Sequence, residues 1–278
     1  MPQTKKRKVP ISKPSTTSTT SSKPQASRNV IRRFHVLIKT QAQLKNKPTL
    51  NVAETEELAK VNEEIERLGG LEWYQRMSAI GQGNDRGGGS EKVFIEWLKG
   101  LKVHEGRQGL LRLLEVGALK PDNYKLCTAW IKNTPIDLRS RHPAIKEQDF
   151  LLLDAKENTK KWDAISLSLV VNFVPDARER GRMLHLAYTM LVDNGYLFLA
   201  LPSPCVTNSR YMSLEHLARL MEILGFTELR RRWREGRKMA YWLYRKHREP
   251  RLLDFKEFAK KIVLRQGNRN NFTILLEG

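Results

Sequence analysis

The stretch Leu110–Gly117 (Leu-Leu-Arg-Leu-Leu-Glu-Val-Gly) decides the fold, because a strand-length apolar run ends there in an acidic residue and a glycine turn. Two later strand candidates end at Asp137 and at Asp149-Phe150. A fourth, Ala164–Val171, is apolar on both faces, as central parallel strands are. Helical patterns, such as the one over about residues 176–192, separate the strands. This alternation predicts an α/β fold, with a doubly wound, mainly parallel sheet and helices on both of its faces.

Further patterns place helices before this sheet and strands after it. Apolar residues at helical spacing predict a helix over about residues 53–68, and Ser90 and Ser213 are expected to cap two others. The remaining strand candidates are Tyr196–Leu201, Thr227–Arg232, Met239–Arg245 and Phe272–Leu276.

Three regions are expected along the chain. Residues 1–50 are predicted to be a disordered basic tail, in which Lys5–Val9 (Lys-Lys-Arg-Lys-Val) is a basic run of the nuclear-import type. Residues 51–100 are expected to form a helical N-terminal segment with a glycine-rich loop at Gly81–Gly89. Residues 101–278 are predicted to hold the sheet domain.

The composition describes a folded protein with localised positive charge. The chain has 278 residues, with 50 Lys and Arg against 30 Asp and Glu, and a formal net charge of +20. Its 40% hydrophobic residues exclude a wholly disordered chain. The excess charge falls in residues 1–50 and 230–251, while the rest of the chain is neutral. Such patches indicate a polyanionic partner. The alternative is a solubilising tail and a solvated hairpin.

The sequence gives no support to secreted, membrane or metal-binding classes. Its apolar stretches are strand-length, against the roughly 20 residues that cross a bilayer, and no apolar segment follows the basic start as in a secretory signal. Cys127 and Cys205 are too few for a disulfide framework and fit a reducing compartment. Neither has metal-ligand spacing to a second Cys or His, so no metal is expected.

The strand ends predict a nucleoside ligand without a pyrophosphate. In open α/β sheets, ligands bind beyond the carboxyl ends of the strands. Asp137 follows Gly117 at the spacing where a carboxylate accepts hydrogen bonds from ribose hydroxyls. Asp149 and Phe150 offer an acceptor and an aromatic wall to an adenine. A single glycine, where dinucleotide sites have G-x-G-x-x-G, disfavours NAD and FAD. S-adenosylmethionine, which has no phosphate, fits the pattern better.

Several short motifs resemble, in order and spacing, those of class I methyltransferases. They are Leu114–Gly117, Pro135–Leu138, Gln148–Phe150, Trp162–Pro175 and Gly195–Phe198. More narrowly, four further motifs resemble the fungal large-subunit (25S) ribosomal RNA adenine-N1 methyltransferase family. These are Trp73–Gln75, Gly87–Ser90, Arg265–Gly267 and Arg269–Phe272. The resemblance extends over roughly residues 55–278.

The resemblance implies a Rossmann-like class I fold, S-adenosylmethionine as cofactor, and methylation of N1 of an adenine in 25S ribosomal RNA. Cofactor contacts are implied at Gly117, Asp137, Asp149, Phe150, Ser168 and, for the cofactor's carboxylate, Arg86. The chain departs from the class I pattern at Leu119 and Pro121, where further glycines are usual. Asn172–Pro175 (Asn-Phe-Val-Pro) lacks the Pro-Pro-aromatic motif of N6-adenine enzymes, which disfavours N6 chemistry.

The expected nucleophile sets the requirements of the catalytic site. N1 of an unpaired adenine has an in-plane lone pair, so its methylation depends on alignment more than on a strong general base. N1 is also a pairing atom, so the base must first leave its stack. We expect Phe173 to stack on the extruded base and Asn172 to hydrogen-bond its edge.

Two other functions remain open at this point. A S-adenosylmethionine-binding sensor that regulates a protein partner without catalysis would use the same cofactor residues, and animal relatives of the family resemble such sensors. A small-molecule methyltransferase would leave the net charge unexplained. The basic regions favour ribosomal RNA or a pre-60S particle as the partner of a nuclear, nucleolar enzyme of ribosome biogenesis. We expect a monomer that needs no membrane and no metal.

Overall fold

The computed structural model describes residues 24–45, 47–70, 72, 89–140, 142–247 and 249–277. The predicted import run at Lys5–Val9, the glycine-rich loop over 81–88 and Arg86 lie outside the described residues.

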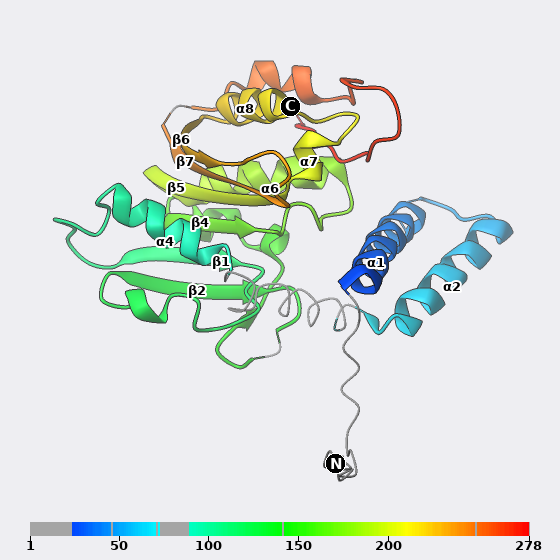
Figure 1. Ribbon diagram of the computed structural model, residues 1–278, viewed down its shortest axis with the longest axis horizontal. Coiled ribbons are helices and arrows are strands. Elements are labelled where there is room, and N and C mark those ends of the chain that lie inside the picture. Colours follow the sequence, from blue (N-terminus) through cyan, green and yellow to red (C-terminus); the bar gives the residue numbers. More distant parts are fainter. Residues whose placement is uncertain are drawn as a thin grey trace, which may run out of the picture.

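A seven-stranded sheet in the order β3-β2-β1-β4-β5-β7-β6 forms the centre of the described chain (Figure 1). The strands are β1 Leu111–Val116, β2 Ile131–Asp137, β3 Lys146–Glu147, β4 Trp162–Ser168, β5 Leu191–Pro202, β6 Phe226–Arg232 and β7 Met239–Lys246. Strand β7 is antiparallel to β5 and β6, and the other pairs are parallel. The chain runs outward from β1 to β3 and then returns to β4 beside β1. The predicted doubly wound sheet is confirmed, with its switch point between β1 and β4.

Alternate residues of β1 reach two separate cores, one on each face of the sheet. Leu113 packs in a cluster with residues of α4 (Glu91–Gly100), whereas Leu114 belongs to the cluster beneath α6 (Ala177–Met190) and α8 (Leu214–Ile223). Helices therefore cover both faces, as the sequence predicts. The shorter helices are α5 Ala155–Asn158, α7 Pro204–Thr207, η2 Lys125–Cys127, η3 Phe150–Leu152 and η4 Leu252–Phe258.

The prediction of a disordered tail over residues 1–50 is wrong for residues 24–45, which form helix α1 (Pro24–Lys45). Phe34 and Leu37 of α1 are buried against Val61 and Ile65 of α2 (Val52–Arg67). The two helices lie side by side (Figure 1). The Arg33 guanidinium of α1 also donates to Glu64 of α2. An acidic partner of α1 thus lies in the next helix, which composition alone does not reveal.

Two predicted strand boundaries are also corrected. The third strand ends at Glu147, because Asp149 caps η3 by accepting the Leu151 N–H at 2.8 Å. Phe272–Leu276 is buried but is not a strand. Its backbone bonds to Ala177 O of α6 at 2.9 Å and to Phe258 O of η4 at 3.1 Å, so it crosses helices instead of pairing in the sheet.

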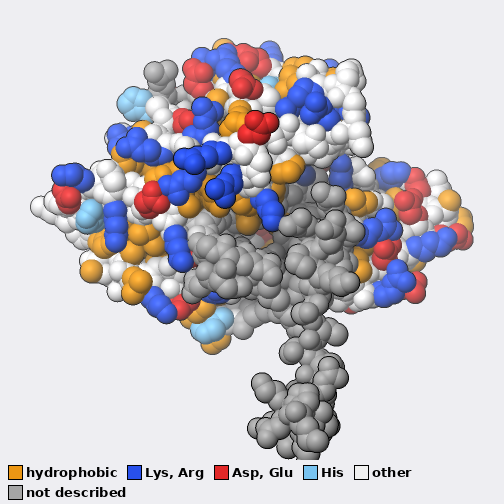
Figure 2. All heavy atoms as spheres, viewed as in Figure 1, with side chains coloured by type: hydrophobic (Ala, Val, Ile, Leu, Met, Phe, Trp, Pro, Cys, Tyr) orange, Lys and Arg blue, Asp and Glu red, His pale blue; other side chains and the backbone are white. Residues whose placement is uncertain are grey.

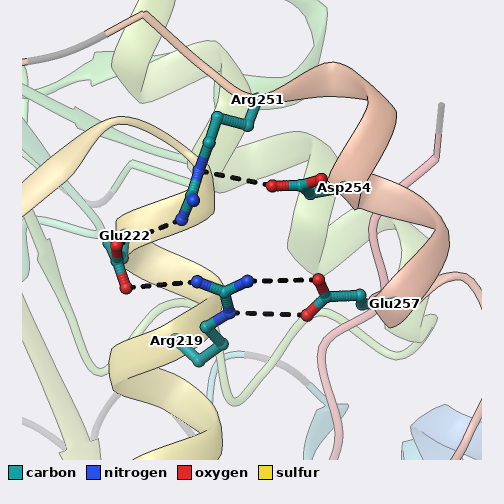
Figure 3. A network of polar contacts seen from close by, with 5 residues as sticks. All are labelled: Arg219, Glu222, Arg251, Asp254 and Glu257. Carbon is teal, nitrogen blue, oxygen red and sulfur yellow. Dashed lines mark hydrogen bonds and ion pairs between the residues drawn. The ribbon is translucent and has the colours of Figure 1, made fainter.

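An ion-pair network joins α8 to η4 at the surface (Figure 3). Arg219 donates to both carboxylate oxygens of Glu257, at 3.1 and 3.4 Å. Arg251 bridges Glu222 at 3.1 Å and Asp254 at 3.4 Å. These partly exposed pairs orient η4, although each adds little to the free energy of unfolding.

The basic segment 230–251 does not form a single patch. Met239 pairs with Pro202 at the carboxyl end of β5, whereas Lys246 lies roughly 24 Å away at the other end of β7. Lys246 is buried, and its ammonium donates to Leu191 O at 2.9 Å. Arg251 is occupied in the network on α8. Within this segment, the turn between β6 and β7 is the part that brings basic residues to the carboxyl edge of the sheet.

Within the described ranges, no helix combines the length and apolar character that a membrane crossing needs.

Candidate cofactor and base site

The turn after β1 is the centre of the candidate site. Gly117 has φ +74°, a conformation that costs other residues free energy. The N–H groups of Gly117 and Ala118 both donate to Ile136 O, at 2.9 and 3.0 Å, which fixes the turn to the end of β2. A Cβ at Gly117 would lie 2.7 Å from Cγ2 of Val170, in the loop after β4. The ends of β1, β2 and β4 therefore converge, as the sequence predicts.

A buried carboxylate lies directly before this turn. Glu115 accepts from Asn123 Nδ2 at 2.6 Å and from Asn133 Nδ2 at 2.7 Å, and burial raises its pKa to about 7. It lines a pocket at the switch point. The other lining residues are Ser90, Glu91, Val116, Gly117, Leu119, Asn123, Tyr124, Ser166 and Ser168.

Ser90 joins the N-terminus of α4 to the end of β4. We expected Ser90 to cap α4, but its side chain makes no capping hydrogen bond. Its hydroxyl instead contacts the hydroxyl of Ser168, the residue predicted to lie against the cofactor from β4. Both hydroxyls line the pocket. This contact between residues 78 positions apart is one that helix-cap rules do not foresee.

The predicted ribose and adenine contacts differ in their surroundings. Asp137 is 9% exposed and accepts the Arg139 N–H at 3.0 Å, so its carboxylate stays at the end of β2. Asp149 uses one oxygen as the η3 cap. Phe150 is only 2% exposed and packs in the main core with Val116 and Ile136, which leaves little of its ring for an adenine.

The loop after β4 carries the predicted base-contacting residues. Leu169 has φ +59°, a strained conformation for a bulky residue and one typical of functional loops. Asn172 has a buried side-chain oxygen that accepts no hydrogen bond from the described part of the chain. Phe173 is partly exposed, and its N–H donates to Val170 O at 2.8 Å. The loop therefore presents an unsatisfied acceptor and an aromatic ring beyond Ser168.

Arg180 of α6 holds this loop from behind and was not foreseen from the sequence. It is 7% exposed, and its guanidinium donates to Val174 O at 2.7 Å, Pro175 O at 3.2 Å and Thr273 O at 2.7 Å. Burial lowers the pKa of Arg180 to about 10. The bond to Thr273 is long-range, and the bonds to Val174 and Pro175 depend on the conformation of the loop. No local sequence motif therefore predicts them.

The structure brings Gly117, Asp137, Ser168 and the Asn172-Phe173 pair to one edge of the sheet. Arg86 lies outside the described residues. In the described ranges no group of three or more His, Cys, Asp or Glu side chains is arranged to hold a metal. Burial raises the pKa of Cys205 to about 12, so its thiol is protonated at neutral pH.

The strand order and the glycine turn at the switch point define a Rossmann-like class I methyltransferase. The model of the family "25S rRNA (adenine(2142)-N(1))-methyltransferase, Bmt2" matches residues 59–274. The chain belongs to this family. Membership supports the enzyme over the sensor alternative.

Two relatives and one solved structure are similar to this chain. The 25S rRNA adenine-N(1) methyltransferase of Schizosaccharomyces pombe is 36% identical over 88% of this chain and 89% of the relative. The 25S rRNA (adenine(2142)-N(1))-methyltransferase of Saccharomyces cerevisiae is 35% identical over 88% of this chain and 71% of the relative. Among solved structures, the 1,6-didemethyltoxoflavin-N1-methyltransferase of Burkholderia thailandensis is 14% identical, with a TM-score of 0.47, and the match covers 73% of this chain and 93% of that one.

Proposed function

We propose that the protein transfers the methyl group of S-adenosylmethionine to N1 of an adenine in 25S ribosomal RNA. Family membership supplies the reaction class. The observation that carries the site assignment is the close packing of Gly117 on Val170. Val170 precedes Asn172 by two residues, so this packing brings the proposed cofactor turn close to the loop that is proposed to hold the base.

The residues at the carboxyl edge fit this cofactor. Gly117 makes the left-handed turn, at φ +74°, that residues with a side chain adopt only at a cost, and its backbone lines the pocket where the ligand is proposed to bind. The Asp137 carboxylate, held by the Arg139 N–H, is suited to ribose hydroxyls. We assign Ser168 and Asp149 to the same ligand, with Phe150 supporting it from the core. Arg86 is proposed for the cofactor's carboxylate on sequence grounds alone.

The loop after β4 is suited to hold an adenine by the edge that carries N1. The exocyclic amine beside N1 is a hydrogen-bond donor, and the buried Asn172 oxygen is an acceptor without a partner in the described chain. Phe173 offers a ring for stacking. The cofactor supplies an electrophilic methyl group on a sulfonium. The N1 lone pair forms the new N–C bond as the S–C bond breaks, and the positive charge passes to the base, so no general base is needed.

We further propose that the substrate is reached in the nucleus, and in the nucleolus in particular, as rRNA or a pre-60S particle, by a monomeric enzyme. The import-type run at Lys5–Val9 supports the nuclear part of this proposal.

The test compares a gene-deletion strain with strains that express the wild type, Asp137→Ala or Asn172→Ala. N1-methyladenosine in 25S rRNA is mapped by reverse-transcription stops and by mass spectrometry of nuclease digests. We expect one modification to disappear on deletion and to return with the wild type only. Unaltered methylation in the deletion strain would contradict the enzyme and favour the sensor.

The two variants separate cofactor binding from base positioning. We expect Asp137→Ala to weaken binding of S-adenosylhomocysteine in calorimetry, whereas Asn172→Ala retains this binding and loses methyl transfer. Phe173→Ala is expected to behave like Asn172→Ala. Normal turnover by Phe173→Ala would exclude its stacking role.

A further inference from the structure

Two basic groups from separate parts of the chain meet at the carboxyl edge of the sheet. The first is the turn between β6 and β7, which carries Arg234, Arg237 and Lys238. The second joins Arg210, which follows α7, to Arg265 and Arg269 of the C-terminal segment. We call these six residues the basic rim.

Two hydrogen bonds to backbone carbonyls connect the two groups of the rim through α7. The Ser203 N–H donates to Lys238 O at 2.8 Å, which fixes the β6–β7 turn to the start of α7. Asn270 Nδ2 donates to Pro204 O at 2.7 Å, which fixes the C-terminal segment to the same helix. The rim therefore begins where β5 ends. Ala200 of β5 pairs with Ser168, and Pro202 pairs with Met239, so the turn lies roughly 7 Å further along the strand than Ser168.

The positive charge of the rim is largely uncompensated. In the described part of the chain, no ion pair involves the side chains of Arg234, Arg237 or Lys238, and all three are exposed. Figure 2 shows Lys and Arg side chains gathered over the surface where β6 and β7 lie. The acidic residue of the turn, Glu235, offsets one of the three charges.

The second group has neutral hydrogen-bond partners. Arg265 donates to the backbone carbonyls of Val206, Thr207, Ser209 and Met212. Arg269 donates to Gln266 O and to the Asn208 side chain. Burial and the neighbouring charge of Arg269 lower the pKa of Arg265, although Glu215 acts in the opposite direction. Carbonyl acceptors fix these guanidinium groups without cancelling their charge, so the group attracts anions.

We propose that the basic rim binds the phosphates of the RNA strand that flank the target adenine and so guides this base to Asn172 and Phe173. This inference rests on the proposed function and names the surface that holds its substrate. Phosphate contacts position a nucleic acid without reading its sequence, which suits long Arg and Lys side chains beside the loop that carries Asn172 and Phe173. Their number sets the salt dependence of binding.

The test uses the triple variant Arg234→Gln, Arg237→Gln and Lys238→Gln of the full chain. Its control removes three exposed charges near the amino ends of the strands, by Lys132→Gln, Lys156→Gln and Lys161→Gln. Binding of a 25S rRNA fragment that contains the target adenine is measured by fluorescence anisotropy between 50 and 300 mM salt. Calorimetry with S-adenosylhomocysteine and thermal unfolding verify that each variant is folded.

We expect the rim variant to bind the fragment about tenfold or more weakly, and to lower the slope of log affinity against log salt by about two to three. The control is expected to change affinity less than about twofold. Arg269→Gln should weaken binding further when it is added to the rim variant. Equal losses in the rim variant and the control would overturn the proposal, as would an unchanged slope in the rim variant.

Methylation kinetics separate this proposal from the proposed function. If the wild type methylates the fragment, the rim variant should have a raised KM for RNA and a kcat near that of the wild type at saturating RNA. A wild type that binds the fragment through the rim but does not methylate it, alone or within pre-60S particles, would contradict the proposed function and leave the rim supported.

Discussion

A Cβ atom at Gly117 would lie 2.7 Å from Cγ2 of Val170, so the turn after β1 and the loop after β4 leave no room for a side chain between them. This contact joins the proposed cofactor side of the site to the proposed base side. A side chain at residue 117 must therefore displace Val170, two residues before Asn172.

We predict that Gly117→Ala abolishes measurable binding of S-adenosylhomocysteine in calorimetry. The substitution adds a left-handed penalty of about 1–2 kcal/mol and an overpacking cost of about 1–3 kcal/mol to the free energy of folding. Gly106→Ala is the control, because Gly106 also has a positive φ, +64°, but a Cβ there meets nothing within 4 Å. Gly106→Ala should lower the free energy of unfolding by the conformational penalty alone and should retain the affinity for S-adenosylhomocysteine. Equal affinities for the two variants would contradict the role of the turn.

We predict that Ser168→Ala weakens binding of S-adenosylhomocysteine and lowers the free energy of unfolding by about 1 kcal/mol. The variant removes the hydroxyl that meets Ser90 and frees the start of α4 from β4. Ser213→Ala is the matched control, since it loses the cap on the His216 N–H, at a similar cost of about 1 kcal/mol, away from the site. If both variants bind the cofactor analogue like the wild type, the Ser90–Ser168 contact is only structural.

The raised pKa of the buried Glu115 side chain predicts that the free energy of unfolding depends on pH. Burial raises its pKa from 4.5 to about 7, so between these pH values the folded state holds a proton that the unfolded state releases. The stabilisation is fully present below about pH 4.5 and is lost as the pH rises through 7, by about 3 kcal/mol. Urea unfolding of the wild type and Glu115→Gln between pH 5 and 8 measures the difference. We expect the variant to lack this decline, and parallel curves would contradict the assignment.

The three hydrogen bonds of the buried Arg180 side chain predict that even its conservative substitution by Lys is strongly destabilising. Arg180→Lys cannot reach all three carbonyls that the guanidinium satisfies, so buried acceptors at Val174, Pro175 or Thr273 lose their donors. We expect a loss of about 2–4 kcal/mol in the free energy of unfolding and a lower kcat. Arg182→Lys, on the same helix but exposed, should cost under about 1 kcal/mol. Equal effects in urea unfolding would show that the buried bonds do not hold the loop.

The sheet and its ligand edge could be predicted because their signals are local. The apolar run before Gly117 and the stretch ending at Asp137 define strands by alternation and length, and the observed strands end within a residue of these predictions. Their parallel order then brings Gly117, Asp137 and Ser168 together without any knowledge of side-chain contacts.

The errors arise where partners are distant in sequence. Helix α1 looked disordered because its acidic partner, α2, lies in another compositional block. The basic segment 230–251 was interpreted as one patch because a charge count does not show that β7 carries its residues to opposite edges of the sheet. Arg180 gave no signal, since one of its acceptors is 93 residues away. Local patterns predict helices and strands, but they do not predict the tertiary contacts that determine where each charged side chain lies.

The path of residues 272–276 across α6 has a consequence for the order of folding. A Cβ at Gly181 would lie 1.8 Å from Leu275 O, so α6 is shaped to receive a segment made nearly a hundred residues later. During synthesis, the sheet can form with α6 in place, yet this face of α6 stays open to water until Leu275 leaves the ribosome. The packing of residues 272–276 on α6 is therefore among the last long-range contacts to form as the chain is made.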